Sequence, residues 1–140
     1  MPTVLYLLVR CLTPGAWVVG EPGESCTRAC AAMSAAHPPR LLGGTVGKWI
    51  CDTSSEARMI TVDSPAKFAA AVSVAGHGEW CLSIGPNLHG HAYPGVAAQQ
   101  EACFYRFPGA SDATAACGAT PFGARERRLC CCVIEGSAGQ

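Results

Sequence analysis

Cysteine is the residue type with the most chemical potential in this sequence. Structural zinc sites favour cysteine pairs two to four residues apart, with a second pair downstream. Only Cys26 and Cys30 come near that spacing, and the wide, irregular intervals elsewhere suit loops closed by covalent bonds. The sequence therefore predicts disulfides, with a cytosolic metal-binding or redox protein as a minor alternative. The ten cysteines are Cys11, Cys26, Cys30, Cys51, Cys81, Cys103, Cys117, Cys130, Cys131 and Cys132.

Two histidines separated by one residue, His89 and His91, have the alternation that could hold a metal from one face of a strand. The Pro and Gly residues on both sides of them instead favour an irregular loop with solvated side chains. Neither Ser83 nor Ser111 lies in a Gly-x-Ser-x-Gly nucleophile elbow, and the chain lacks a phosphate-binding glycine loop. We therefore predict no catalytic residue, no cofactor and no metal.

The charged side chains offer two further candidates. Asp52 and Glu56 could share one face of a helix, and a solvated pair is the favoured interpretation. Arg125, Arg127 and Arg128 could contact a sulfate or a glycan carboxylate, although a solvated edge is favoured over that role. Charged residues make up 14% of the chain and the formal net charge is zero. This balance implies neither nucleic acid nor an acidic membrane surface as a partner.

The amino terminus favours export. Residues 4–9 form a short apolar run, and small or branched residues precede a potential cleavage point after Gly20. We expect residues 1–20 to be a signal peptide or anchor, which places the protein outside the cell or in the lumen of the secretory pathway. Arg10 interrupts the run, so the alternative is an ordinary buried strand that opens the domain. No other stretch approaches the length of a membrane span.

Two helices are predicted. The first follows Ser25, a good N-cap, and its alanine-rich sequence places Cys26 and Cys30 on one face, where they should bond to two different partners. The second begins at Pro65 after the N-cap Ser64 and ends before Gly76. Its buried face should carry four residues at helical spacing, namely Phe68, Ala71, Val72 and Ala75.

Aromatic and β-branched residues predict short strands in three places. The predicted fold is a small α+β disulfide-rich domain with two short helices and a few short antiparallel strands. Its cysteine-rich core should span residues 21–134, followed by a frayed tail over residues 135–140. The expected strands lie within residues 80–84, 103–107 and 129–134, and residues 40–48 read as a glycine-rich loop.

Two motifs enclose this region: Gly23-Glu24-Ser25-Cys26-x₃-Cys30 opens it, and Arg127-Arg128-Leu129-Cys130-x-Cys132 closes it. A Phe-centred helix, a lone cysteine and Cys-Phe-Tyr lie between them. This order resembles the cysteine-rich C-terminal segment of the alpha-1,6-mannosylglycoprotein 6-beta-N-acetylglucosaminyltransferases (N-acetylglucosaminyltransferase V). That segment is an appendage of a large Golgi enzyme whose sugar-nucleotide lobes are absent from this chain, so no catalytic residue is implied.

The resemblance implies an eight-cysteine framework whose connectivity the sequence leaves open. If Cys11 leaves with residues 1–20, nine cysteines remain. Cys131 is then predicted to be a free thiol or to link two chains in a disulfide-bonded dimer. The framework cysteines are Cys26, Cys30, Cys51, Cys81, Cys103, Cys117, Cys130 and Cys132.

These observations favour a secreted or lumenal, non-catalytic cysteine-rich module that binds protein or glycan. Nucleic acid is not expected as a partner, and no membrane span is expected beyond the N-terminal segment. The enzymatic alternative is a partial piece of a Golgi-type N-acetylglucosaminyltransferase.

Overall fold

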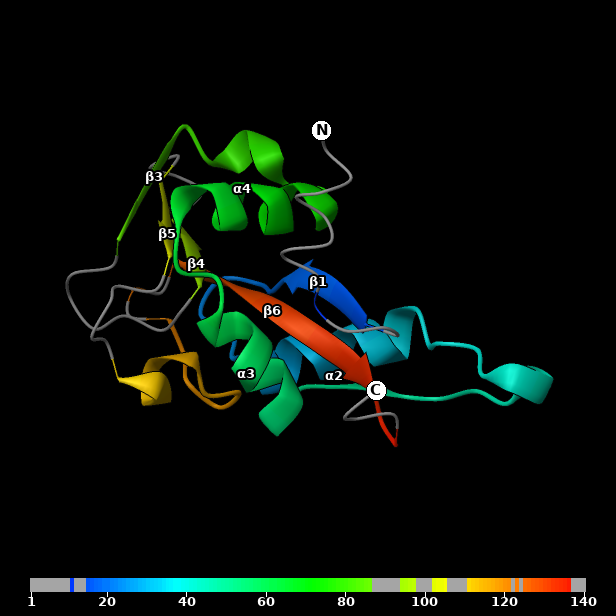
Figure 1. The fold of residues 1–140 in the computed structure, drawn as a ribbon. Coiled ribbons are helices and arrows are strands. Elements are labelled where there is room, and N and C mark those ends of the chain that lie inside the picture. Colours follow the sequence, from blue (N-terminus) through cyan, green and yellow to red (C-terminus); the bar gives the residue numbers. More distant parts are fainter. Residues whose placement is uncertain are drawn as a thin grey trace.

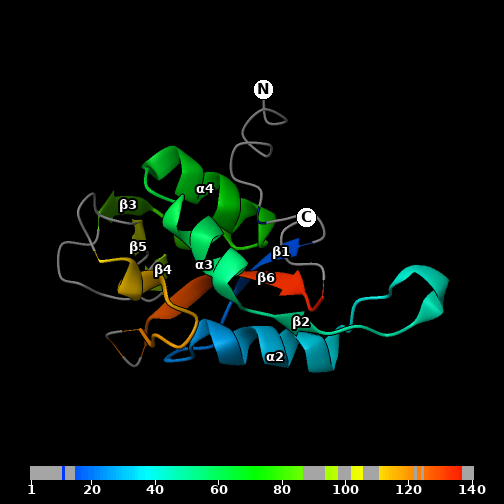
Figure 2. The same cartoon turned by 60° about the horizontal axis from the view of Figure 1, so that its bottom comes forward.

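A computed structural model describes residue 11 and residues 15–86, 94–97, 102–105, 111–121, 123 and 125–136. Within these residues, three α-helices pack around a mixed sheet (Figures 1 and 2). The α-helices are α2 (Cys26–Ala36), α3 (Thr53–Ile60) and α4 (Pro65–Val74). The strands are β1 (Gly15–Val19), β2 (Trp49–Ile50), β3 (Ser83–Pro86), β4 (Gly95–Ala97), β5 (Ala102–Tyr105) and β6 (Arg127–Ile134). The predicted small α+β disulfide-rich fold is confirmed.

Strand β6 is the centre of the sheet. Its neighbours follow the order β1-β6-β4-β5-β3, and β2 also pairs with β6. All pairings are antiparallel except that of β3 with β5. Residues 128–134 are buried without interruption, which is typical of a strand covered on both faces. In Figure 2, β1 and β6 lie between α4 on one side and α2 on the other.

Helix α4 has the predicted construction. The Ser64 side chain accepts a hydrogen bond from the Lys67 amide, Pro65 occupies the first turn, and Gly76 adopts a φ of 87° just after the helix. Phe68, Ala71 and Val72 are buried, while Ala75 is half-buried. The first predicted helix is also confirmed as α2, because the Ser25 side chain accepts from the Arg28 amide.

Helix α3 was not predicted, so the expected number of two helices is wrong. Asp52 caps it by accepting hydrogen bonds from the amides of Ser54 and Ser55. Ser55 and Met59, four residues apart, face the interior. The sequence of α3 is polar and rich in Ser and Thr, and these residues have weak helix propensity. The Asp52 cap and the burial of Met59 therefore stabilise this segment as a helix despite its weak helix propensity.

The expected strands are found with shifted ends. Residues 129–134 lie in β6, and residues 103–105 lie in β5, while residues 106–107 fall outside the described part. The stretch 80–84 is mostly not a strand: Gly78–Trp80 forms a 3₁₀ turn and β3 begins at Ser83. Of the predicted tail, only residues 135 and 136 are described, and they form a turn after β6.

Residues 39–48 form a hairpin that projects from the body, which we call the finger. It is drawn in turquoise at the right of Figures 1 and 2. Arg40 and Val46 form an isolated antiparallel bridge, and a short 3₁₀ turn, Leu42–Gly44, makes the tip. Within the described part of the chain, no helix combines the length and apolar character that crossing a membrane requires.

Candidate functional site

Three consecutive cysteines on β6 anchor the molecule. Cys130 bonds to Cys26 and Cys132 bonds to Cys30, so that α2 is tied to one face of the strand. The spacing of the cysteines on α2 matches the spacing of their partners on β6, because four residues along a helix and two residues along a strand both advance about 6–7 Å. The prediction that the two helix cysteines reach different partners is confirmed.

The remaining framework cysteines pair with each other, as Cys51–Cys117 and Cys81–Cys103. The first bond joins the start of α3 to the loop before β6. The second joins the segment before β3 to β5. The Cα–Cα separations of the disulfides run from 5.3 to 5.7 Å, within the normal range.

The predicted free or intermolecular thiol at Cys131 is wrong for this structure, because Cys131 bonds to Cys11 within the same chain. Neighbouring side chains on a strand point to opposite faces, so Cys131 cannot face α2 with its neighbours. Cys11 is 3% exposed on the other face and lies just ahead of β1, which pairs with β6. The odd cysteine count assumed that Cys11 was removed.

The predicted signal or anchor, residues 1–20, is described only at residue 11 and residues 15–20. Gly15–Val19 is β1, with Trp17 opposite Cys131 and Val18 opposite Cys130. Residues 15–19 therefore form a strand of the domain, in which Trp17 is buried. The apolar run 4–9 lies outside the described residues, so the signal or anchor stays a prediction. Cleavage after Gly20 would remove β1 and Cys11 together.

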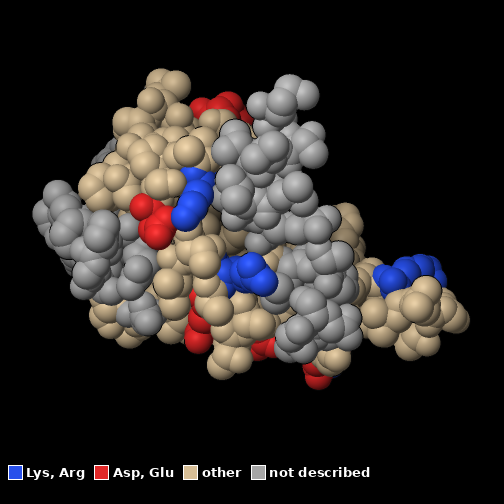
Figure 3. Space-filling model, viewed as in Figure 1, with Lys and Arg blue, Asp and Glu red and all other residues tan. Residues whose placement is uncertain are grey.

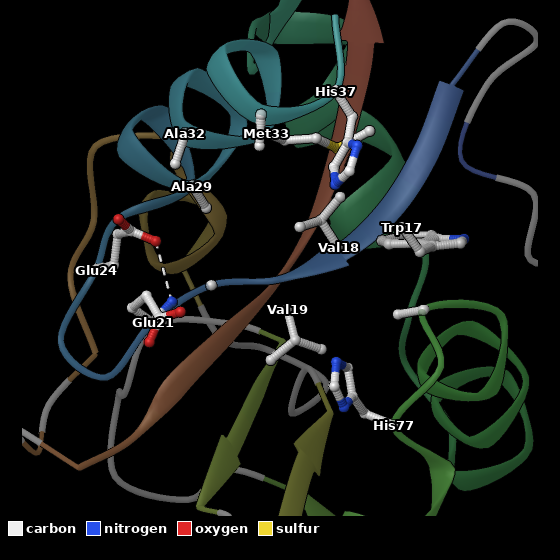
Figure 4. A pocket seen from close by; sticks show the side chains of 13 residues that line it. Trp17, Val18, Val19, Glu21, Glu24, Ala29, Ala32, Met33, His37 and His77 are labelled. Carbon is white, nitrogen blue, oxygen red and sulfur yellow. Dashed lines mark hydrogen bonds between the residues drawn. The ribbon is translucent and has the colours of Figure 1, made fainter.

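An open groove lies between α2 and β1 and continues to the end of α4 (Figure 4). Its volume is about 650 Å³ and its walls are mostly apolar. Alanines at one-turn spacing give the α2 wall a smooth surface, and Val18 and Val19 come from β1. The lining residues are Trp17, Val18, Val19, Gly20, Glu21, Glu24, Ala29, Ala32, Met33, Ala36, His37, Ala75 and His77.

The groove has an acidic end. The Glu21 amide donates to Oε1 of Glu24 at 3.0 Å, and this contact is drawn dashed in Figure 4. The Glu21 carboxylate lies 3.7 Å from Nη1 of Arg127, which also donates to the carbonyl oxygen of Gly20 at 3.3 Å. Glu21 remains largely exposed, with 77% of its side chain accessible. The carboxylates can therefore meet a cationic group that enters this end.

A stack of three side chains borders the groove near His77. The His77 ring stacks on Trp80 with the ring centroids 4.0 Å apart. The Arg127 guanidinium carbon lies 4.9 Å from the centroid of the Trp80 ring. A cation near the face of an indole ring is attracted by its quadrupole. The Trp80 ring is thus already engaged by two partners.

The three arginines expected at a solvated edge have different environments. Arg128 is fully buried, and its Nη1 donates to the carbonyl oxygens of Ala116 and Ala119. Burial lowers the pKa of Arg128 to about 10, and the negative charge of Glu56 opposes that shift. The solvated-edge interpretation is wrong for Arg128, which joins β6 to the preceding loop. Arg125 is exposed, and Arg127 is half-buried beside Trp80.

Three of the other candidate polar residues, Asp52, Glu56 and Ser111, have structural roles. Asp52 caps α3, and Glu56 Oε2 accepts a hydrogen bond from the Cys117 amide at 2.7 Å, so the two acids are not a solvated pair. Ser111 caps a 3₁₀ turn, and Ser83 is exposed in β3. His89 and His91 lie outside the described residues. Among the described residues, no cluster of three or more potential metal ligands is present.

Sequence reasoning did not find the groove. Its walls come from β1, which was assigned to a removable segment, and from the alanines of α2, which carry no chemical signal of their own. Comparison with protein-family models, curated proteins and solved structures finds no match to the chain.

Proposed function

We propose that this protein is a non-catalytic, disulfide-rich binding module of the extracellular space or secretory lumen, and that it holds a segment of a protein ligand in the groove between α2 and β1. The observation that carries the proposal is the groove itself, with apolar walls and two carboxylates at one end. A few convergent polar groups in a mostly apolar concavity are typical of ligand sites.

The cysteine chemistry supports the proposed compartment. All ten cysteines are paired, and three of the bonds converge on adjacent residues of the central strand. Disulfides persist in oxidising compartments and are rare where glutathione and thioredoxin keep thiols reduced. Because the central strand β6 is held by three disulfides, the fold supports a location in an oxidising compartment.

A peptide fits the groove better than a glycan does. Sugar rings pack their apolar faces on exposed aromatic rings, and the groove does not offer one among its described residues. Trp17 is 6% exposed, and Trp80 already contacts His77 and Arg127. Ala29, Ala32 and Ala36 instead leave room for aliphatic side chains. The preferred ligand is an apolar segment with a lysine, arginine or free amino group near Glu21 and Glu24.

The groove is tested by selection from a displayed library of random peptides on the oxidised protein. We expect the enriched peptides to share an apolar residue next to Lys or Arg. Ala32→Trp fills the groove and should abolish their binding. Ala35→Trp is the matched control, since Ala35 is an exposed alanine of the same helix outside the groove. Glu24→Gln should weaken the preference for a basic residue.

Two results would overturn the proposal: no enrichment of any peptide family, or enriched peptides that bind Ala32→Trp as well as the wild type. Folding of each variant is checked by non-reducing electrophoresis and far-UV circular dichroism, because a scrambled variant would lose binding for another reason.

The resemblance to the C-terminal segment of N-acetylglucosaminyltransferase V remains a second proposal. Its support is that the opening and closing motifs lie together, joined by Cys26–Cys130 and Cys30–Cys132. In that case the groove would face other parts of a larger chain. Transcript sequence on both sides of this reading frame tests it: continuous coding sequence for sugar-nucleotide lobes would favour the enzyme, and its absence would reject it.

A further inference from the structure

We propose that the finger, residues 39–48, inserts its apolar tip into a phospholipid surface that exposes anionic headgroups to the extracellular space or secretory lumen. This inference is independent of the groove, because the finger projects away from the body (Figures 1 and 2). It rests on three properties of the finger: its ordered backbone, its exposed aliphatic tip and its local positive charge.

The backbone of the finger is held in place. The Leu41 amide donates to the carbonyl oxygen of Thr45 at 2.8 Å, and the Gly47 amide donates to that of Pro39 at 2.8 Å. Gly43 and Gly44 both have a φ of 84°, a conformation that glycine adopts without strain, and they reverse the chain at the tip. The backbone of the finger is therefore closed by hydrogen bonds on both sides of its tip.

The tip exposes aliphatic side chains. Leu42 is 101% exposed, Val46 is 59% exposed and Leu41 is 38% exposed. The sum of these exposed fractions corresponds to about two fully exposed side chains. Single exposed aliphatic residues are ordinary, but three on one projection form a concentrated apolar tip. A specific protein interface uses about 20–30 residues a side, so the tip alone is too small for one. A bilayer accepts a convex tip of this size without a matching shape.

The charge on the finger is one-sided. Arg40 and Lys48 flank the tip, and no acidic residue occurs between Glu24 and Asp52 in the sequence. Figure 3 shows Lys or Arg atoms, and no Asp or Glu atoms, on the visible face of the projection. Basic residues beside an apolar tip favour anionic lipid headgroups. The zero net charge of the whole chain conceals this local concentration.

A tryptophan stands at the base of the finger. Trp49 is half-buried, and its Nε1 donates to the carbonyl oxygen of His37 at 3.0 Å. Tryptophan is enriched at the level of lipid headgroups because its ring is apolar and its N–H is polar. The Trp49 ring also packs in part against the core, so this residue fixes the base of the finger to the body.

Co-sedimentation of the oxidised protein with vesicles tests the proposal. Wild type should bind phosphatidylcholine vesicles that contain phosphatidylserine, and should bind pure phosphatidylcholine vesicles more weakly. Leu42→Ser should lower the affinity for these vesicles about tenfold or more, since it removes one aliphatic side chain that the bound bilayer would bury. The double variant Arg40→Gln, Lys48→Gln should lower it about 25-fold, because each cation near an anionic surface contributes about fivefold.

Matched controls lie elsewhere on the chain. Leu82 is 77% exposed outside the finger, so Leu82→Ser should bind vesicles like the wild type. The double variant of the exposed helical arginines, Arg28→Gln and Arg58→Gln, removes the same charge and should also leave binding intact.

Failure of the wild type to bind either vesicle overturns the proposal, as does equal loss of binding in the finger variants and their controls. Sedimentation velocity gives a further readout. If Leu42→Ser breaks a self-association while vesicles are ignored, the tip contacts protein and the proposal is rejected. Ala32→Trp in the groove should leave vesicle binding unchanged. Failure of the lipid proposal is therefore distinguishable from failure of the peptide-binding proposal.

Discussion

The disulfides are nested, and nesting reverses the order of their expected contributions to stability. Cys26–Cys130 joins residues 104 apart, and Cys51–Cys117 joins residues 66 apart. Taken singly, the longer loop would lose more chain entropy in the unfolded state. The other bonds change that comparison, because an unfolded chain that retains them is already closed into smaller rings.

Cys30–Cys132 ties the chain four residues from Cys26 and two residues from Cys130, so the bond between those two closes a ring of only about six residues. The shortest ring closed by Cys51–Cys117 also runs through Cys30–Cys132 and spans about 36 residues. The chain-entropy relation then assigns about 2 kcal/mol to the first bond and about 4 kcal/mol to the second at 25 °C.

Urea unfolding of two alanine pair variants measures this difference. Loss of packing around the buried Cys26 and Cys130 adds to the first value, so the slope of unfolding free energy against urea is the sharper readout. Removal of Cys51–Cys117 should raise that slope, because the unfolded chain expands. Removal of Cys26–Cys130 should leave the slope nearly unchanged. The reasoning is refuted if the slope rises more in the Cys26, Cys130 variant.

Three further changes have defined outcomes. Phe68→Ala in α4 should lower the unfolding free energy by about 3–5 kcal/mol, whereas Lys67→Ala on the exposed face should change it by no more than about 0.5 kcal/mol; similar losses would contradict the assigned faces. Cys131→Ser should expose Cys11 to thiol labelling and cost about 3 kcal/mol, and labelling of any other cysteine would reject the pairing. Asp52→Ala should destabilise the protein by about 0.5–2 kcal/mol in chemical denaturation, and Asp52→Asn by a few tenths; equal losses would show that the cap is unimportant.

Local signals predicted the parts of the fold that depend on local interactions. Helix α4 combines a capping serine, a proline in the first turn and a terminal glycine, and each acts within a few residues. The different partners of Cys26 and Cys30 followed from helix geometry alone. Helix α3 has the capping Asp52 but neither a proline in its first turn nor a glycine at its end. It also depends on burying Met59 against Arg128 and Cys26, which are distant in sequence.

The errors at the candidate site have a common origin in long-range pairing. Residues 15–19 have a composition that also suits the end of a signal segment, and only their pairing with β6 identifies them as β1. Removal of residues 1–20 stays a prediction. Once β1 is part of the domain, Cys11 joins the count and Cys131 acquires a partner. Arg128 was misjudged for a similar reason, since the carbonyl oxygens that surround it become available only when residues 116–119 fold beside β6.

The intact mass of the native protein, with alkylation before and after reduction, tests the covalent basis of this account most directly. Five bridges predict that no thiol is alkylated before reduction and that reduction adds ten hydrogen atoms, about 10 Da. Cleavage anywhere before Cys11 leaves that result unchanged. A chain cut after Gly20, with nine cysteines and one alkylated thiol in the native protein, would contradict the role of β1 and the bond between Cys11 and Cys131.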